Sequence, residues 1–168
     1  MSVKNIKLWG WDKKPRTMLR YIKVGDIICY ESNDNDSLSF RYGQIIAKLT
    51  SGHVFRGFDV QHQNPDDITA GEITTAKQYG KIFVLDVYTT LDKKKYLKNG
   101  EWRVIGRENN FKLNSNEIKK VFFSFGVKGM KYRVDLLDNT VPISDVEAEN
   151  YISSGPVTGD QAKIWYLN

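Results

Sequence analysis

Short runs of apolar and β-branched residues, separated by polar turns, follow one another along most of this chain. The clearest alternation runs from Met130 to Leu136, where every second residue is apolar and the residues between them are charged. That period of two predicts a β-strand with one buried face and one solvated face. Further strands are predicted at residues 24–31, 38–49, 54–60, 81–91, 102–106 and 119–125.

Helix is predicted only near the end of the chain. Ser144 stands three residues before Glu147, which is the spacing of a capping box, so a short helix is expected from there to about Ser153. Residues 160–167 fit either a last helical turn or an edge strand. Residues 61–75 contain few apolar side chains and are expected to form a long surface loop.

These elements together predict a mostly β fold: a curled antiparallel sheet, barrel-like or a sandwich, with a short C-terminal helix. The length of 168 residues fits a single domain, residues 1–168, and a composition with 40% hydrophobic and 27% charged residues is typical of folded chains. Residues 1–23 are expected to form a strand or an irregular basic arm, either packed on the β scaffold or free of it.

Cysteine usage and hydropathy indicate the compartment. Cys29 is the only cysteine and lies in the apolar run at residues 27–30, so we expect a buried thiol and no disulfide within the chain. No apolar run approaches the roughly 18 residues that span a bilayer, and the chain does not open on a signal-peptide pattern. We therefore expect a protein that acts in the reducing cytoplasm and has no membrane partner.

The net charge of +5 is unevenly distributed. Residues 1–23 contain seven basic side chains and a single acidic one, Asp12. Residues 57–76 and 134–162 contain carboxylates and neither lysine nor arginine. This distribution predicts an acidic face opposite a basic one.

Patterns that would indicate catalysis or metal binding are weak. His53 and His62 are the only histidines, and nothing in their spacing matches a metal site. The sequence has no Walker loop, no GxGxxG fingerprint and no GxSxG elbow. Asp86, placed inside the strand predicted at residues 81–91, would suit acid or base work if buried, but a paired or solvent-facing carboxylate is the preferred interpretation. No catalytic residue, metal site or cofactor is predicted.

The basic leading segment supports an alternative hypothesis, a nucleic-acid-binding β-barrel. Trp9 and Trp11 lie on the same side of an extended chain, and tryptophans beside cations stack with bases in proteins that bind single strands. Packing of these aromatic side chains in the core is the competing interpretation. The candidate nucleic-acid-binding residues are Lys7, Trp9, Trp11, Lys13, Lys14, Arg16 and Arg20.

Three landmarks occur in a characteristic order: Gly25 and Asp26 before Ile27 and Ile28, Tyr42 and Gly43 before Ile45 and Ile46, and Trp102 with Ile105 and Gly106. Their order and spacing, over residues 19–106, resemble the immunity protein 26 family of bacterial polymorphic toxin systems. Members of that family are small all-β proteins encoded beside the toxins that they neutralise. Each landmark also has a structural explanation as a tight turn, a bulge or a core anchor, so the motifs support the fold more than a site.

The resemblance implies a non-enzymatic protein whose partner is a cognate toxin C-terminal domain, delivered by a neighbouring cell as in contact-dependent growth inhibition. Such a protein would cover the active site or the substrate surface of its toxin. For a basic nuclease toxin, the predicted contacts are the carboxylates Asp59, Asp66, Asp67 and Glu72, followed by Asp145, Glu147 and Glu149. The net positive charge of this chain departs from the acidity common among immunity proteins against nucleases.

Overall fold

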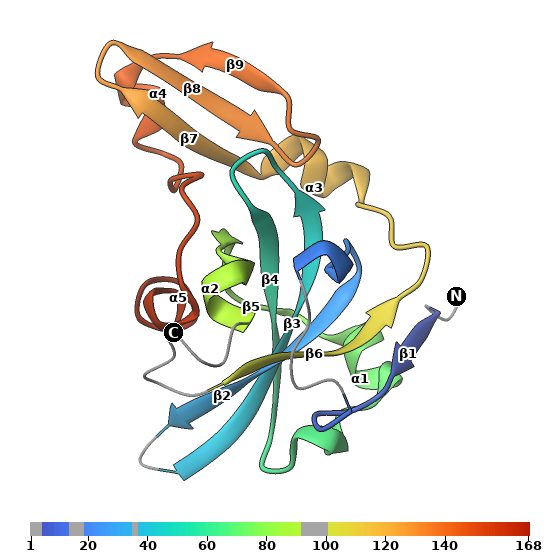
Figure 1. Cartoon of the computed structure of the whole chain (residues 1–168). Coiled ribbons are helices and arrows are strands. Elements are labelled where there is room, and N and C mark those ends of the chain that lie inside the picture. Colours follow the sequence, from blue (N-terminus) through green and yellow to red (C-terminus); the bar gives the residue numbers. More distant parts are fainter. Residues whose placement is uncertain (1–4, 14–18, 35–36, 92–100) are drawn as a thin grey trace.

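The structure is a computed structural model that describes residues 5–13, 19–34, 37–91 and 101–168 (Figure 1). Its strands are β1 (Ile6–Leu8), β2 (Asp26–Asp34), β3 (Ser37–Lys48), β4 (His53–His62), β5 (Gln78–Leu85), β6 (Trp102–Glu108), β7 (Phe122–Val127), β8 (Met130–Asp135) and β9 (Thr140–Ile143). They form two antiparallel sheets: sheet A, in the order β1-β6-β2-β3-β4-β5, and sheet B, in the order β7-β8-β9. The prediction of a mostly β, antiparallel fold is confirmed, and sheet A is open because β1 and β5 do not pair with each other.

Seven short helices precede, connect or follow these strands in the described residues. They are η1 (Leu19–Tyr21), η2 (Pro65–Asp67), α1 (Ala70–Thr75), α2 (Val87–Leu91), α3 (Ser115–Lys120), α4 (Asp145–Ala148) and α5 (Gly159–Trp165). The prediction that helix occurs only near the end of the chain is therefore wrong. The earlier helices span only one to two turns, too short for an apolar period to appear, and they depend on local caps such as the Thr69 side chain, which accepts a hydrogen bond from the Glu72 amide.

Two predicted segments have a different structure. The strand expected at residues 81–91 ends at Leu85, and the Asp86 carboxylate accepts a hydrogen bond from the Thr89 amide at the start of α2. Asp86 is thus a helix-start residue and not a strand carboxylate. The loop expected at residues 61–75 contains η2 and α1, and it is ordered by caps at Asn64 and Thr69.

The C-terminal region agrees in part with the prediction. The Ser144 side chain accepts a hydrogen bond from the Glu147 amide, as the capping spacing predicted, but α4 ends at Ala148 and does not reach Ser153. The segment left undecided at residues 160–167 is mostly the helix α5. Its capping box is formed by Thr158 and Gln161, each of which bonds the backbone amide of the other.

Both faces of sheet A are covered, which explains why its strands are apolar without alternation. One core contains side chains of α2 and α5, and the other contains side chains of α1 and Trp11 (Figure 1). The first core contains Ile28, Tyr30, Ile45, Phe55, Phe83, Leu85, Trp102, Val104, Leu91 and Ala162. The second contains Trp11, Ile27, Cys29, Phe40, Tyr42, Phe58, Ile68, Ile73 and Ile105. The expectation of a buried Cys29 is confirmed.

The Gly25 and Asp26 landmark fixes the entry into β2. Gly25 has a φ of 100°, and a Cβ there would lie 2.5 Å from the Glu108 carbonyl oxygen, so only glycine fits. The Asp26 carboxylate is fully buried and accepts hydrogen bonds from Arg107 Nε at 2.5 Å and from the Lys23 amide at 2.9 Å. This landmark therefore belongs to the scaffold.

The other two landmarks are also structural. The ring of Phe55 lies against Gly43, where any Cβ would clash with it, and the β3–β4 register shifts on either side of this glycine. Trp102 is buried and stacks on Tyr30, with ring centroids 4.2 Å apart and planes at 14°. The core anchor expected at Trp102 is present, whereas Gly43 itself pairs regularly with Gly57 and marks a close approach between two irregularities of β3.

Candidate functional site

The leading segment is packed on sheet A wherever it is described. β1 pairs with β6, and Trp9 Nε1 donates to the Val104 carbonyl at 3.1 Å. Trp11 is only 8% exposed, and the Arg103 guanidinium lies 4.3 Å from the centre of its ring. Because Trp11 belongs to the core, it offers no free surface on which a base could stack.

The structure describes three of the five remaining nucleic-acid candidates. Lys7, Lys13 and Arg20 are exposed, and Arg20 lies over the ring of its neighbour Tyr21. Lys14 and Arg16 lie outside the described residues.

The first acidic segment contacts the basic arm and does not lie on a separate face. Asp66 Oδ1 accepts a hydrogen bond from the Trp11 amide at 2.9 Å, so this carboxylate holds the arm against the scaffold. Glu72 Oε2 lies 2.6 Å from His62 Nε2. Asp59 and Asp67 are exposed, and their carboxylates have no hydrogen-bond or ion-pair partner among the described residues. These two side chains are the ones available to a partner.

The second acidic group lies on sheet B. Both oxygens of the Asp145 carboxylate are within hydrogen-bond distance of the Gly129 amide, at 2.9 and 3.1 Å, so Asp145 supports the β7–β8 turn. Glu147 is half-buried, and Glu149 is exposed. The structure therefore separates the two acidic groups, one beside α1 and one on sheet B.

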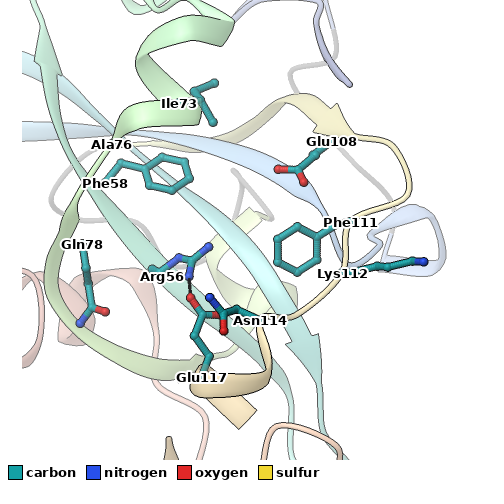
Figure 2. A pocket seen from close by; sticks show the side chains of 10 residues that line it. All are labelled: Arg56, Phe58, Ile73, Ala76, Gln78, Glu108, Phe111, Lys112, Asn114 and Glu117. Carbon is teal, nitrogen blue, oxygen red and sulfur yellow. Dashed lines mark hydrogen bonds and ion pairs between the residues drawn. The ribbon is translucent and has the colours of Figure 1, made fainter. Parts of the chain in front are cut away.

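A polar hollow of about 440 Å³ lies between sheet A and α3 (Figure 2). Arg56 and Glu117 form an ion pair inside it, and the buried carboxylate of Glu108 accepts a hydrogen bond from Gln44 Nε2 at 3.1 Å. Phe58 closes part of the apolar wall. Arg56, Glu117 and Glu108 are thus paired with one another or with the scaffold, an arrangement that suits structural support of α3.

Three buried side chains, those of Cys29, Tyr42 and His53, carry groups that could act as a nucleophile or a base. Burial raises the pKa of the Cys29 thiol and the pKa of the Tyr42 hydroxyl, so neither is a ready nucleophile. The Tyr42 hydroxyl instead donates to the Pro65 carbonyl at 2.9 Å. Burial, with help from the charge of Lys48, lowers the pKa of His53. In the part of the chain that the structure describes, no cluster of three or more metal-binding side chains occurs, and no helix has the length and apolar character to cross a bilayer.

Sheet B carries an exposed apolar surface that the sequence did not predict. The strand Met130–Leu136 was expected to bury one whole face, but only Val134 and Leu136 are buried, whereas Met130 is 63% exposed. The reason is that sheet B extends past the end of sheet A, so its far half has no layer beneath it (Figure 1). That prediction is corrected for the first half of β8.

Cross-strand pairing places five side chains together on this uncovered part. Val127 pairs with Met130, Phe125 pairs with Tyr132, and Tyr132 pairs with Pro142 of β9, so all lie on one side of the sheet. Phe125 is 39% exposed and Val127 is 68% exposed. We name this surface the hairpin face; it consists of Phe125, Val127, Met130, Tyr132 and Pro142.

A signal for this surface exists in the sequence. Residues 119–133 contain five basic side chains, no acidic one and four aromatic rings. Neither alternation nor total charge reveals that the rings at the far end are exposed, because exposure depends on which layer lies beneath them.

Comparison with known proteins assigns the family. A family model described as Immunity protein 26 matches residues 23–133, a stretch that contains all three landmarks, β7 and the first four residues of β8. No curated protein and no solved structure matches the chain. The match covers more than half of the sequence and agrees with the mostly β fold. This chain therefore belongs to the immunity protein 26 family.

Proposed function

We propose that this protein neutralises a cognate bacterial toxin domain by binding it directly and covering its active site or its substrate surface. The observation that carries the proposal is the match of the immunity protein 26 model to residues 23–133. In this proposal the protein acts in the cytoplasm, without catalysis, against a toxin delivered by contact-dependent growth inhibition. A nuclease is the proposed toxin activity.

The packing supports a rigid binding scaffold. Sheet A is covered on both faces, and sheet B joins it through a shared core in which Phe123 and Val134 contact Ile46 and Val54. This common core supports treating residues 1–168 as one domain. Rigid scaffolds lose little conformational entropy on binding, which favours tight complexes.

Acidic contacts remain the proposal for a basic nuclease toxin. Asp59 and Asp67 are the first choice, because their carboxylates are exposed and unengaged among the described residues. Asp66 and Glu72 are already held by Trp11 and His62, so their loss would also disturb the scaffold. Glu149, Glu147 and Asp145, on sheet B, are the second choice.

The test of the proposed function is co-expression with the C-terminal domain of the large secreted protein encoded beside this gene. We expect the cells to survive and the two chains to co-purify as a stable, roughly equimolar complex. The control is the toxin domain expressed alone, which should kill. Killing that continues in the presence of this protein, with no complex recovered, would refute the proposal.

Charge neutralisation tests the acidic contacts. The double variant Asp59→Asn/Asp67→Asn should slow association with a basic toxin about tenfold at low salt, because exposed charges act mainly on the rate of encounter. The matched control is Asp12→Asn with Asp138→Asn, which removes two exposed carboxylates that are not among the predicted toxin contacts. An association rate equal to that of the unmodified protein would remove Asp59 and Asp67 from the interface.

A further inference from the structure

Sheet B is preformed and only half covered. At its base, Phe123 and Val134 complete the core shared with sheet A, whereas the far half of sheet B extends past the ends of β3 and β4. Exposed apolar side chains on a folded surface are common when single, but five adjacent ones typically mark an interaction site. The hairpin face is such a cluster.

The hairpin face is held in one conformation. The rings of Phe125 and Tyr132 stack with centroids 5.3 Å apart and planes at 18°. The turn that follows Val127 is fixed by the Asp145 carboxylate, which bonds the Gly129 amide. A surface built of rigid aromatic and aliphatic groups can dock a partner with little ordering cost.

The opposite side of sheet B is covered around Phe122. Phe122 packs on Tyr151, at 5.7 Å between ring centroids, and the Arg133 guanidinium lies 4.4 Å from the centre of the Phe122 ring. The Ser124 amide donates to the Ile152 carbonyl, and the Ser154 amide donates to the Ser124 carbonyl, so residues 152–154 run along the edge of β7. The C-terminal segment therefore contacts the Phe122 end of that side and the edge of β7, whereas the hairpin face is on the side away from the Phe122 ring.

The charges around the hairpin face favour a particular partner. Residues 119–133 carry five positive charges and no negative one, with Lys128 exposed at the tip of the turn. A second copy of this chain would bring the same positive charges together, so it is a poor occupant. A nucleic acid is also disfavoured, because Lys131 and Arg133 are on the other side of the sheet by alternation, with Lys131 Nζ bonded to the Gly126 carbonyl and Arg133 packed on Phe122.

We propose that the hairpin face is the surface that docks the toxin domain, and that the toxin presents there an apolar patch bordered by carboxylates. This inference rests on the proposed function and deepens it. The apolar centre supplies most of the affinity, while Lys128, exposed at the tip of the turn, speeds encounter with a carboxylate at the border of that patch. Four of the five residues of the hairpin face, all except Pro142, lie within the stretch that matches the family model. The acidic residues Asp59 and Asp67 lie toward the far end of β4 (Figure 1), so the two surfaces can be tested separately.

The test uses the full chain, with the double variant Val127→Ser/Met130→Ser. The matched control is Val141→Ser/Val146→Ser, which removes two exposed apolar side chains from the same part of the molecule; Val141 faces the other side of sheet B because it pairs with Arg133. Thermal melting of both variants checks that each is folded. The probe is the C-terminal domain of the large secreted protein encoded beside this gene, and binding is measured by titration calorimetry together with survival on co-expression.

We expect the Val127→Ser/Met130→Ser variant to bind the probe about 30-fold more weakly or worse and to lose protection, as loss of hot-spot residues does. The Val141→Ser/Val146→Ser control should stay within about threefold of the unmodified protein. Lys128→Glu should slow association about tenfold at low salt, and the difference should shrink as the salt concentration rises.

The outcomes separate the inference from the proposed function. If the unmodified protein binds the probe and the Val127→Ser/Met130→Ser variant binds it equally well, the inference is wrong while the proposed function stands. If the unmodified protein neither binds the probe nor protects, the proposed function itself fails. Binding of a single-stranded oligonucleotide that the unmodified protein shows and this variant loses, in place of toxin binding, would overturn the choice of a protein partner.

Discussion

Sheet A and sheet B use similar strands in opposite ways. In sheet A, β2 and β3 bury residues on both faces, and even charged groups such as Asp26 are enclosed and paired. In sheet B, one strand passes from core to surface within two residues: Phe123 is 1% exposed, whereas Phe125, on the same side, is 39% exposed. The contrast shows that the same aromatic pattern contributes to the core where a second layer exists and stays exposed to solvent where none does.

The largest expected effect is on the core of sheet A. Trp102→Ala should lower the free energy of unfolding by about 5 kcal/mol, because it removes a fully packed ring that stacks on Tyr30 and contacts Phe55. Urea denaturation followed by circular dichroism measures the loss, and Trp165→Ala, at an exposed tryptophan, is the control, with a change below about 1 kcal/mol. Equal losses for both variants would contradict the distinction between core and surface.

A matched pair in β7 tests the contrast within one strand. Phe123→Ala should cost about 3–4 kcal/mol, whereas Phe125→Ala should cost less than about 1 kcal/mol, because only Phe123 leaves a cavity in the shared core. Both losses are read from the urea midpoint at constant slope. A large loss for Phe125→Ala would mean that the hairpin face stabilises the fold and is not kept for a partner.

The ion pair between Asp26 and Arg107 should contribute less to the free energy of unfolding than either core ring, that of Trp102 or that of Phe123. Asp26→Asn should lower the free energy of unfolding by about 2 kcal/mol, because Arg107 loses its charged partner but, being partly exposed, keeps contact with water. Adding Arg107→Gln to this variant should recover part of the loss, since it removes the uncompensated charge. If the double variant is as unstable as the sum of the two single variants, the pair makes no specific contribution.

The smallest expected effect concerns pH. The folded state lowers the pKa of His53 from its ordinary value of 6.5, mainly through burial, so this histidine stays neutral at a pH where the unfolded chain has begun to take up a proton. Its contribution to stability is therefore fully present above pH 6.5 and is lost progressively as the pH falls below that value. His53→Gln should remove this slope, which is measured as the difference in urea midpoint between pH 7 and pH 5 for the two proteins. If the urea midpoint changes equally with pH in the two proteins, His53 is not the cause of the pH dependence.

Much of the fold could be predicted from the sequence. The strands at residues 24–31, 38–49 and 54–60 were placed within a few residues of β2, β3 and β4, because β-branched runs ended by polar turns are a local signal. The helices α1, α2 and α3 were not predicted, since each is short and is stabilised by caps and neighbours more than by its own apolar pattern.

The candidate site was harder to predict. The local excess of carboxylates in the sequence made these residues candidates, but contacts formed only in the folded chain decide which carboxylates a partner can reach. Asp66 accepts a hydrogen bond from the Trp11 amide, 55 residues away in the sequence, whereas Asp67 is exposed. Likewise, the sequence made Trp11 a candidate for base stacking, but in the structure Arg103 and Phe40 pack on its ring.

The sequence by itself determined the strands, the mostly β class, the buried thiol of Cys29 and the three landmarks of the family, because each depends on residue type and near neighbours. Only the tertiary structure decided that Met130 and Phe125 face solvent while Val134 and Phe123, on the same side of the same strands, face the core. The physical reason is that an alternating pattern assigns a residue to a side of a sheet, whereas burial requires a second layer, and the far half of sheet B extends beyond the one that sheet A provides.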